Sequence, residues 1–227
     1  MNNLVLITSI INTPNTPLSY SNVRSVFTRK ERYTQTKKTI QSIKEKIPNY
    51  KIMIVECTNF TEEEKSYFEN ECHYVLNLWD KKELHYNIFG VWKSMGEGTM
   101  TIEAFKYIFE KKIDFNNLFK ISGRYWLGDK FKYKNFINDK MVFKHNENGI
   151  ITTTLYKIPK IYIIEIYNLL YKILITDNNK EIMYEKIFTL FADQYIINRC
   201  GDNPIINFVY MIGINGFCTT KGAPFSF

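Results

Sequence analysis

The sequence predicts an α/β protein with a mainly parallel central sheet flanked by helices. Through residue 127, short β-branched runs alternate with stretches of helical apolar spacing, a pattern typical of parallel sheets covered on both faces. Two of the helical stretches open with capping-box sequences. At 227 residues the chain is long enough for one large core, so we expect a single domain over 1–227.

The first half is predicted to be strand and helix in turn. Thr28 and Thr61 each stand three residues before a Glu, the spacing of a capping box. Pro48 is expected to end the helix that follows Thr28, because proline cannot continue a helix. Strands are expected at 4–11, 51–57, 74–76 and 118–127, and helices at 29–47, from 62 onward and at about 97–112.

The second half follows a different order. Strands are expected at 141–144 and 150–156, and two long helices at about 160–175 and 181–198. An apolar tail interrupted by glycines covers 208–217. We find no internal repeat and no low-complexity linker, which again favours one domain.

Composition narrows the class of protein. Hydrophobic residues make up 45% and charged residues 23%, which excludes a disordered chain. The net charge of +7 and the pI of about 9.0 fit a polyanionic ligand, whether nucleic acid, an anionic membrane or a nucleotide diphosphate. A solvated basic surface is the plainer interpretation.

The cysteines and the first apolar run indicate a cytoplasmic protein. Cys57, Cys72, Cys200 and Cys218 form no C-x-x-C pair, so reduced thiols are expected. The run 4–11 is too short to span a bilayer and lacks the basic segment of a signal peptide. We therefore expect a buried strand there and no transmembrane segment; the sequence predicts no oligomeric state.

Several polar residues stand where the predicted strands end. In open α/β sheets, ligands bind beyond the carboxyl ends of the strands. This rule selects Thr8, Ser9, Glu56 and the segment 122–125. Glu56 follows four apolar residues, where a carboxylate is costly to bury unless it is paired. It is either a ligand-binding group or a cap for a neighbouring loop.

Common catalytic motifs are missing. The sequence contains no G-x-G-x-x-G, no P-loop and no G-x-S-x-G, which argues against dinucleotide binding, P-loop hydrolysis and an α/β-hydrolase. His73, His85 and His145 do not form an H-E-x-x-H pattern, so no histidine-rich metal site is expected.

Four segments together carry a family resemblance: 24–36, 54–57, 93–97 and 119–125, with a looser match at 184–185 and 211–217. In this order they resemble small nucleotide-sugar glycosyltransferases with the glycosyltransferase-A fold, found in large DNA viruses and bacterial polysaccharide loci. The resemblance implies a nucleotide-sugar-binding half at 1–127 and an acceptor-side half at 128–227. The implied partners are a nucleoside-diphosphate sugar and a glycan or other hydroxyl acceptor.

The sequence departs from this family at the end of the fourth predicted strand. There the family usually has Asp-x-Asp, which holds Mg²⁺ or Mn²⁺ on the sugar diphosphate, whereas this chain has Ser122, Gly123 and Arg124. Serine and arginine are poor ligands for a hard cation, but arginine can pair with diphosphate oxygens. We therefore expect transfer that requires no cofactor and no metal site, with Gly123 allowing close approach of a ligand.

The resemblance also places Lys93, Gly96 and Glu97 near the donor. Lys93 would present a charge to phosphate, unless it is a solvated lysine. Glu97 is equally explained as a carboxylate that favours a helix N-terminus. The predicted donor-binding set is completed by Arg24, Arg32 and Tyr125.

Sugar transfer needs stabilisation of the leaving group and deprotonation of the acceptor. Arg124 and Lys93 are the candidates for the first role, with Arg24 or Arg32 next. Glu185 is the candidate base, because the family's catalytic carboxylate often follows the acceptor-side strands. On a helical wheel it points away from the apolar positions 187, 190 and 191, which fits either a cleft or a solvated face. Asp193 is the second candidate.

Two other functions stay open from the sequence. One is a catalytically inactive relative that binds sugar nucleotides. The other is a basic nucleic-acid-binding protein, but the basic residues are scattered and no RNA-recognition signature is present. Nucleic acid is therefore not expected as a partner.

Overall fold

The computed structural model describes residues 2–198 and 205–226. Its strands are β1 (Asn3–Ser9), β2 (Tyr50–Glu56), β3 (Tyr74–Asn77), β4 (Asn117–Ser122), β5 (Tyr125–Leu127), β6 (Met141–His145), β7 (Ile151–Pro159), β8 (Ile206–Phe208), β9 (Ile214–Phe217) and β10 (Pro224–Ser226). Its helices are α1 (Arg29–Lys46), α2 (Glu62–Glu71), α3 (His85–Phe89), α4 (Lys93–Glu110), α5 (Ile163–Leu170) and α6 (Tyr184–Asn198). Single 3₁₀ turns cover Lys82–Leu84, Tyr133–Phe136 and Lys160–Tyr162, and a π-helical turn covers Tyr171–Thr176.

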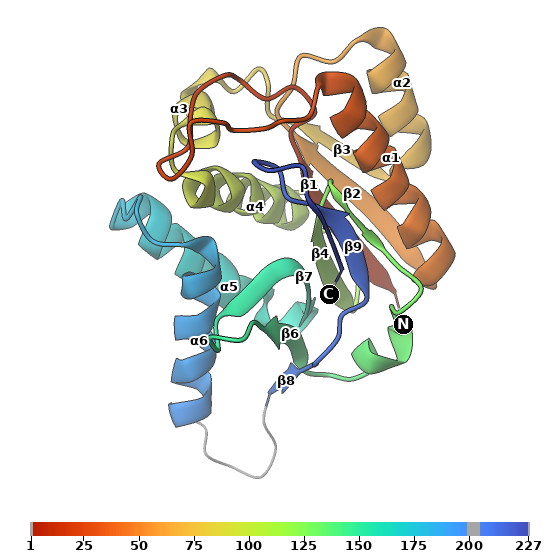
Figure 1. Ribbon diagram of the computed structural model, residues 1–227. Helices are drawn as coiled ribbons and strands as arrows, with labels where there is room; N and C mark the ends of the chain where they lie inside the picture. The colour runs from red at the N-terminus through yellow and green to blue at the C-terminus, as the bar shows by residue number, and fades with distance from the viewer. Residues whose placement is uncertain (1, 199–204, 227) are drawn as a thin grey trace.

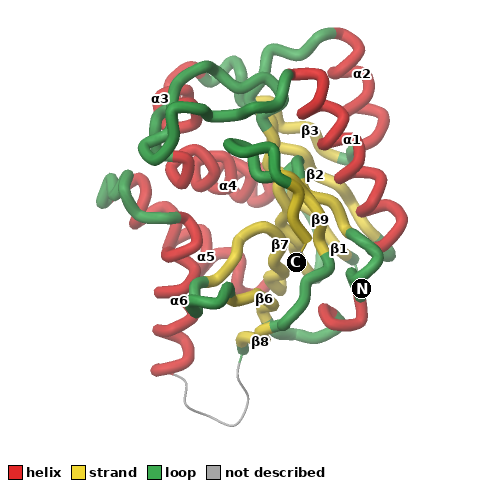
Figure 2. Tube along the Cα trace, in the orientation of Figure 1, coloured by secondary structure: helices red, strands yellow, loops and turns green. Residues whose placement is uncertain are grey.

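A mostly parallel sheet of seven strands forms the centre of the fold (Figures 1 and 2), in the order β3-β2-β1-β4-β7-β6-β8. The first four strands of the chain are parallel to one another, as the strand–helix alternation predicts. Strand β7 is antiparallel to both β4 and β6, and β8 is parallel to β6. The predicted α/β class with a mainly parallel sheet is confirmed.

Helices cover both faces of this sheet and divide the core in two. Along β1, Leu4 and Leu6 face one cluster of buried residues, while Val5 and Ile7 face the other. This alternation follows from the two-residue period of a strand. Figure 1 shows α1 and α2 on one side of the sheet and α4 on the other, with α5 and α6 beyond it.

Both predicted capping boxes are present. At each helix start the threonine side chain accepts from the backbone N–H of the Glu three residues later, and that Glu accepts from the N–H of the threonine. Thr28 thereby opens α1 and Thr61 opens α2. Helix α1 ends at Lys46, two residues before Pro48, as predicted.

Other helix predictions need correction. Helix α4 begins at Lys93, one turn before the expected start at 97. Phe109, in the last turn of α4, is 39% exposed and lies edge-on to Tyr167. Leu190, expected on the apolar face of α6, is 42% exposed. The long helix expected at 160–175 is α5 continued by the π-helical turn.

None of the helices described is long and apolar enough to cross a membrane.

The apolar tail contributes short strands that periodicity did not predict. Strand β8 joins the edge of the large sheet, while β9 pairs with β5 and β10 in a second, antiparallel sheet. These strands have three or four residues, too few for an alternating pattern to emerge.

The cysteines that the structure describes are free thiols. Cys57 and Cys72 are buried, and burial raises the pKa of each thiol to about 12. Cys218 is partly exposed. Cys200 lies outside the described residues. The expectation of reduced thiols therefore agrees with the three described cysteines.

Candidate functional site

The register of the parallel strands brings the predicted strand-end residues together. Ser9 of β1 lies opposite Glu56 of β2, and Thr8 lies opposite Ser122 of β4. Just beyond β4, the Gly123 amide donates to the Thr8 carbonyl at 2.9 Å. The carboxyl ends of three adjacent strands thus form one edge, the place where ligands bind in open α/β sheets.

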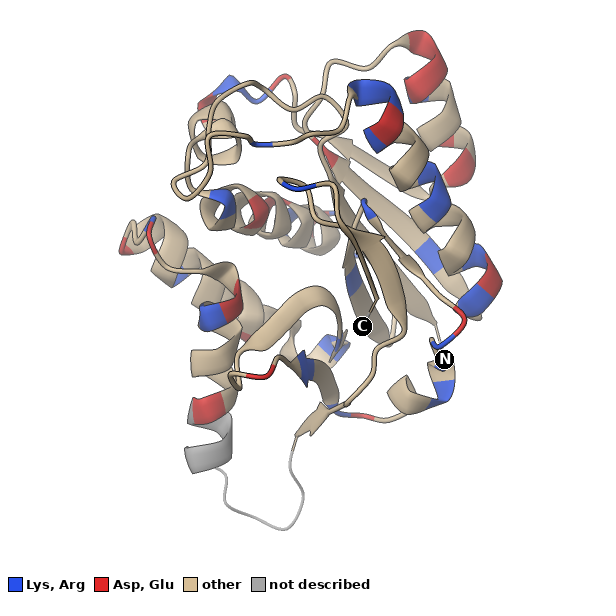
Figure 3. Cartoon of the chain, in the orientation of Figure 1, with Lys and Arg blue, Asp and Glu red and all other residues tan. Residues whose placement is uncertain are grey.

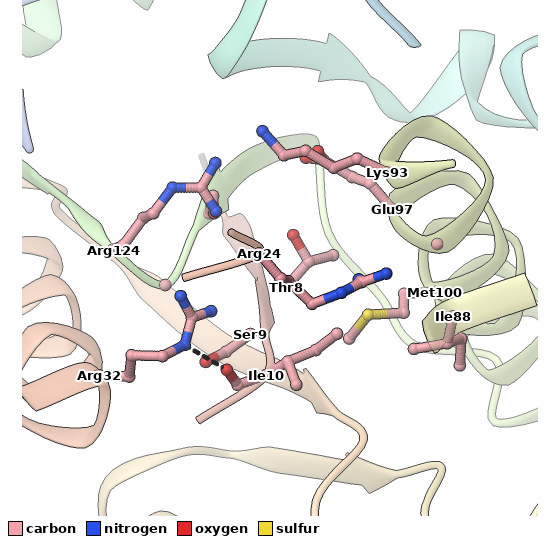
Figure 4. Close-up of a pocket in the computed structure, with 13 residues that line it drawn as sticks. Thr8, Ser9, Ile10, Arg24, Arg32, Ile88, Lys93, Glu97, Met100 and Arg124 are labelled. Carbon is pink, nitrogen blue, oxygen red and sulfur yellow. Dashed lines mark hydrogen bonds between the residues drawn. The ribbon is translucent and has the colours of Figure 1, made fainter. Parts of the chain in front are cut away.

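A narrow cavity of about 80 Å³ opens at this edge, between the strand ends and helix α4. Ten of the twelve residues predicted to bind the donor line it: Thr8, Ser9, Ser122, Gly123 and Arg124 at the strand ends, Lys93, Gly96 and Glu97 on α4, and Arg24 and Arg32. Figure 4 shows Arg32 and Arg124 on one side of this space and Lys93 and Glu97 on the other. We call this space the donor cavity.

Glu56 does not line the donor cavity. Its buried carboxylate accepts hydrogen bonds from the backbone N–H groups of Ile11 and Cys57, at 3.1 and 3.0 Å, and from the Thr58 hydroxyl at 2.7 Å. Burial outweighs these bonds and raises the pKa of Glu56. The loop-capping alternative therefore describes the contacts that the structure gives this residue.

Tyr125, the other predicted donor residue outside the donor cavity, lines a neighbouring space of about 410 Å³. The two spaces adjoin each other: Arg24, Arg32, Lys93 and Arg124 line both. The Tyr125 hydroxyl accepts a hydrogen bond from Arg124 Nη2 at 2.9 Å.

Two of the four cationic side chains that line the donor cavity, Arg24 and Arg32, donate hydrogen bonds to backbone carbonyls. Arg24 Nε donates to the Thr16 carbonyl at 2.9 Å, and its Nη2 donates to the carbonyls of Phe89 and Gly90. Arg32 Nε donates to the Ile10 carbonyl at 2.6 Å. Arg24 thus ties the loop after β1 to the loop before α4, which leaves less of its guanidinium for a ligand.

Arg124 and Lys93 are differently placed. Arg124 Nε is buried and has no hydrogen-bond partner in the part of the chain that the structure describes. No described residue forms a hydrogen bond or ion pair with the Lys93 ammonium. Figure 4 shows the two charged ends pointing toward the same space from opposite sides. The Arg124 charge, together with burial, lowers the pKa of Lys93 to about 8.

Positive charge is crowded in this cavity, and Glu97 offsets only part of it: although burial acts to lower it, the pKa of Arg124 is raised by Tyr125 and Glu97. Arg32 is also affected by the crowded positive charge, because burial and the nearby Arg124 lower the pKa of Arg32 to about 10. A buried donor without a partner is costly, and so is an uncompensated charge. A bound phosphate or diphosphate would supply both the acceptor oxygens and the negative charge.

Glu97 is the acid of the donor cavity, and it has a partner that the sequence analysis missed. Lys120, on β4, has a fully buried side chain and forms an ion pair with the Glu97 carboxylate. Although burial acts to raise it, the pKa of Glu97 is lowered, because Lys120, Lys93 and Arg124 surround it. The available signal was a lysine within the apolar run 118–121.

A larger cavity of about 520 Å³ adjoins the donor cavity and shares Lys93 and Glu97 with it. We call it the second cavity. Glu185, the candidate base, lines it at the start of α6 and accepts from the Thr153 hydroxyl at 3.1 Å. Asp193 lies about two turns farther along α6 and is exposed. The structure thus brings Glu185, but not Asp193, beside the donor residues.

The two glycines have packing roles that the sequence interpretation did not anticipate. A Cβ on Gly123 would lie 2.7 Å from the Ser9 Cβ, and one on Gly96 would lie 2.7 Å from the Ile88 carbonyl oxygen. Gly123 therefore allows the end of β4 to pack against β1, rather than opening space for a ligand. Gly96 does the same for α4 against α3.

The side chains at the end of β4 do not supply the oxygen ligands that a hard divalent cation needs. A serine hydroxyl and a guanidinium stand there, and the neighbouring Glu97 is engaged by Lys120. Among residues 2–198 and 205–226, no three His, Cys, Asp or Glu side chains gather to hold a metal ion.

No model of a known protein family matches the sequence, and no curated protein sequence matches it either. Solved structures do. A candidate nucleotide-diphospho-sugar transferase from Desulfovibrio desulfuricans G20 aligns with a TM-score of 0.51 at 8% identity, over 92% of this chain and 80% of its own. Mouse xyloside xylosyltransferase 1 gives 0.50 at 7% identity, over 92% and 85%. The chain has a glycosyltransferase-A-like fold.

A glycosyltransferase involved in glycosylation of the PBCV-1 major capsid gives a TM-score of 0.49 at 12% identity, over 93% of this chain and 84% of its own, too low to support an argument. At these identities the similarity defines the fold, and the function has to be argued from the site.

Proposed function

We propose that this chain is a glycosyltransferase that moves a sugar from a nucleoside-diphosphate sugar to a hydroxyl acceptor without metal chelation at the end of β4. The observation that carries the proposal is a pair of cations at the carboxyl ends of parallel strands. Among the described residues, the Lys93 ammonium has no hydrogen-bond or ion-pair partner, and the buried Nε of Arg124 has no hydrogen-bond partner. That edge is where this class of sheet binds ligands.

The diphosphate would lie between Arg124 and Lys93. Arginine presents two donors in a fixed plane that matches phosphate oxygens, and lysine adds a compact charge. The leaving nucleoside diphosphate gains negative charge as the sugar departs. Groups already aimed at that charge stabilise the transition state more than the ground state. Arg32, which also lines the cavity, would add to the positive electrostatic potential at the diphosphate.

Glu185 would act as the base for the acceptor hydroxyl. Its carboxylate faces the second cavity, which meets the donor cavity at Lys93 and Glu97. The hydrogen bond from Thr153 to Oε1 fixes the side chain while leaving the other oxygen for a proton. The second cavity has the size range of a small-ligand site, so it is our candidate for the sugar and acceptor.

Two other functions make different predictions. A catalytically inactive relative would bind the donor without hydrolysing or transferring it. A nucleic-acid binder would show affinity that falls steeply with salt. Figure 3 shows Lys and Arg distributed over many elements and mixed with Asp and Glu on α1, which does not favour a single basic surface for nucleic acid.

The test is a thermal-shift panel of nucleoside diphosphates and nucleotide sugars in excess EDTA, then transfer from the best donor. A true donor should stabilise the protein by about 2.7 kcal/mol at a hundredfold excess over its Kd. Transfer should persist in EDTA. Activity that EDTA abolishes and Mn²⁺ restores would contradict metal-independent transfer, and binding without hydrolysis or transfer would favour the inactive relative.

A further inference from the structure

Lys120 occupies an unusual place for a lysine. It lies on the central strand β4 with no exposed side-chain surface, and its ammonium forms an ion pair with Glu97. A buried ion pair is rarely a gain in stability over an apolar pair, because both charges lose their hydration. The pair therefore calls for an explanation other than stability.

Glu97 has two other cations available to it. Lys93 stands four residues earlier on α4, the spacing at which side chains of a helix meet, and Arg124 lies across the donor cavity. The charges of both act on the Glu97 carboxylate. Lys93 and Arg124 line the donor cavity, whereas Lys120 does not. The Glu97 carboxylate is thus paired with Lys120, the one of these three cations that does not line the donor cavity.

We propose that Lys120 is a positioning residue that occupies the Glu97 carboxylate, so that Lys93 and Arg124 stay free to bind the diphosphate; this rests on the proposed function. Without Lys120, the buried carboxylate would be left unpaired. It would then pair with Lys93 or Arg124 and compete with the ligand for them. Lys120 thus acts on the diphosphate through Glu97, without touching the ligand.

The surroundings of Lys120 hold it in this role. Its ammonium lies 5.6 Å from the ring centroid of Tyr184 and 5.9 Å from that of Tyr156, within the range of cation–π attraction. The two tyrosine hydroxyls are 3.2 Å apart, and Tyr184 donates to Thr101 Oγ1 at 3.1 Å. This network joins β4, β7, α4 and α6, so Lys120 has little freedom to leave Glu97.

The test is a double-mutant cycle on ligand affinity. Lys120→Met, Glu97→Gln and the double variant are compared with the wild type by isothermal titration calorimetry, with UDP, GDP and inorganic pyrophosphate as probes. Lys106→Met is the matched control, because it breaks a Lys–Glu pair of 2.7 Å on the same helix, outside the donor cavity. Near-UV circular dichroism reports whether each variant is folded.

Lys120→Met should weaken diphosphate binding by about tenfold or more, the scale of losing one charged hydrogen bond. Glu97→Gln should bind as tightly as the wild type or more tightly, since no carboxylate remains to compete. The double variant should match Glu97→Gln, and Lys106→Met should match the wild type. This rescue separates positioning from a general loss of structure, which a second substitution would not repair.

Two results would overturn the inference: folded Lys120→Met that binds like the wild type, or a double variant as weak as Lys120→Met. If Lys120→Met does not fold, the comparison of Glu97→Gln with the double variant decides. Equal affinity supports the inference, and a tenfold weaker double variant shows that Lys120 acts without Glu97. Wild-type protein that binds none of the probes overturns the proposed function together with this inference.

Discussion

Replacing Arg124 with lysine keeps a positive charge at the end of β4 but removes the planar pair of donors. Replacing it with alanine removes both. Among the described residues, Arg124 makes one side-chain hydrogen bond, to the Tyr125 hydroxyl, and its Nε has no partner. The residue is thus placed to gain hydrogen bonds when a diphosphate binds, and the two substitutions separate charge from geometry.

The expected losses follow from these contacts. Two hydrogen bonds to a charged group are worth about 3–6 kcal/mol together. We expect the lower end for Arg124→Ala, because Lys93 regains its full charge when Arg124 is removed. About 3 kcal/mol is roughly a hundredfold in Kd. Arg124→Lys should lose about half of that, or roughly tenfold.

Arg124→Ala should weaken the binding of a nucleoside diphosphate without a matching loss in the free energy of unfolding. The Arg124 charge is the main cause that lowers the pKa of Lys93 from 10.5 to about 8, and such a shift amounts to about 3 kcal/mol at most. Removing Arg124 relieves this repulsion but also ends its attraction to Tyr125 and Glu97, which raise the pKa of Arg124 although burial acts to lower it. The two effects oppose each other, so the free energy of unfolding of the ligand-free alanine variant should change little. The assays are calorimetric titration with UDP and GDP, and urea unfolding without ligand. Unchanged affinity, or parallel losses of affinity and stability, would refute the reasoning.

Three further predictions test other parts of the site. Affinity for a nucleoside diphosphate should fall as pH rises through about 8, where Lys93 loses its charge, and Lys93→Met should bind weakly at neutral pH without this dependence. The ligand-free protein should gain stability over the same rise, because its repelled lysine deprotonates before an unfolded one does. Glu185→Gln should lower turnover by about 10²–10⁴-fold in a transfer assay and leave the donor Kd unchanged; normal turnover would move the role of base to Asp193. Gly123→Ala should lower the free energy of urea unfolding by about 1–3 kcal/mol, since its Cβ meets Ser9, and an unchanged value would mean that the contact yields.

The fold was predictable where local signals were strong. The capping boxes at Thr28 and Thr61 and the β-branched runs predicted α1, β1, β2 and the start of α2 within a residue or two. The second sheet was not predictable, because β5, β9 and β10 have three or four residues and pair across long stretches of sequence. Such strands carry almost no periodic signal.

The donor cavity was largely predictable because parallel strands end at a common edge. The strand-end rule placed Ser9 and Ser122 together, and the family order added Arg24 and Lys93. Sequence could not show that Arg24 is occupied by backbone carbonyls, nor that Lys120 pairs with Glu97. Both depend on which donors a folded loop or helix brings within reach, which spacing along the chain does not encode.

The small sheet has a consequence for the order in which the molecule folds. Arg124 lies in the turn directly between β4 of the large sheet and β5 of the small one, and Tyr125 of β5 pairs with Gly216, 91 positions later. The large sheet also needs a long loop to close, because β1 and β4 pair across 114 positions. The small sheet differs in that its strands have only three or four residues, and such short strands are not stable without a core to pack on. We therefore expect the small sheet to dock after the large one has formed. The repelling charges of Arg124, Lys93 and Arg32 would then be brought together in a late step, once the core can hold them.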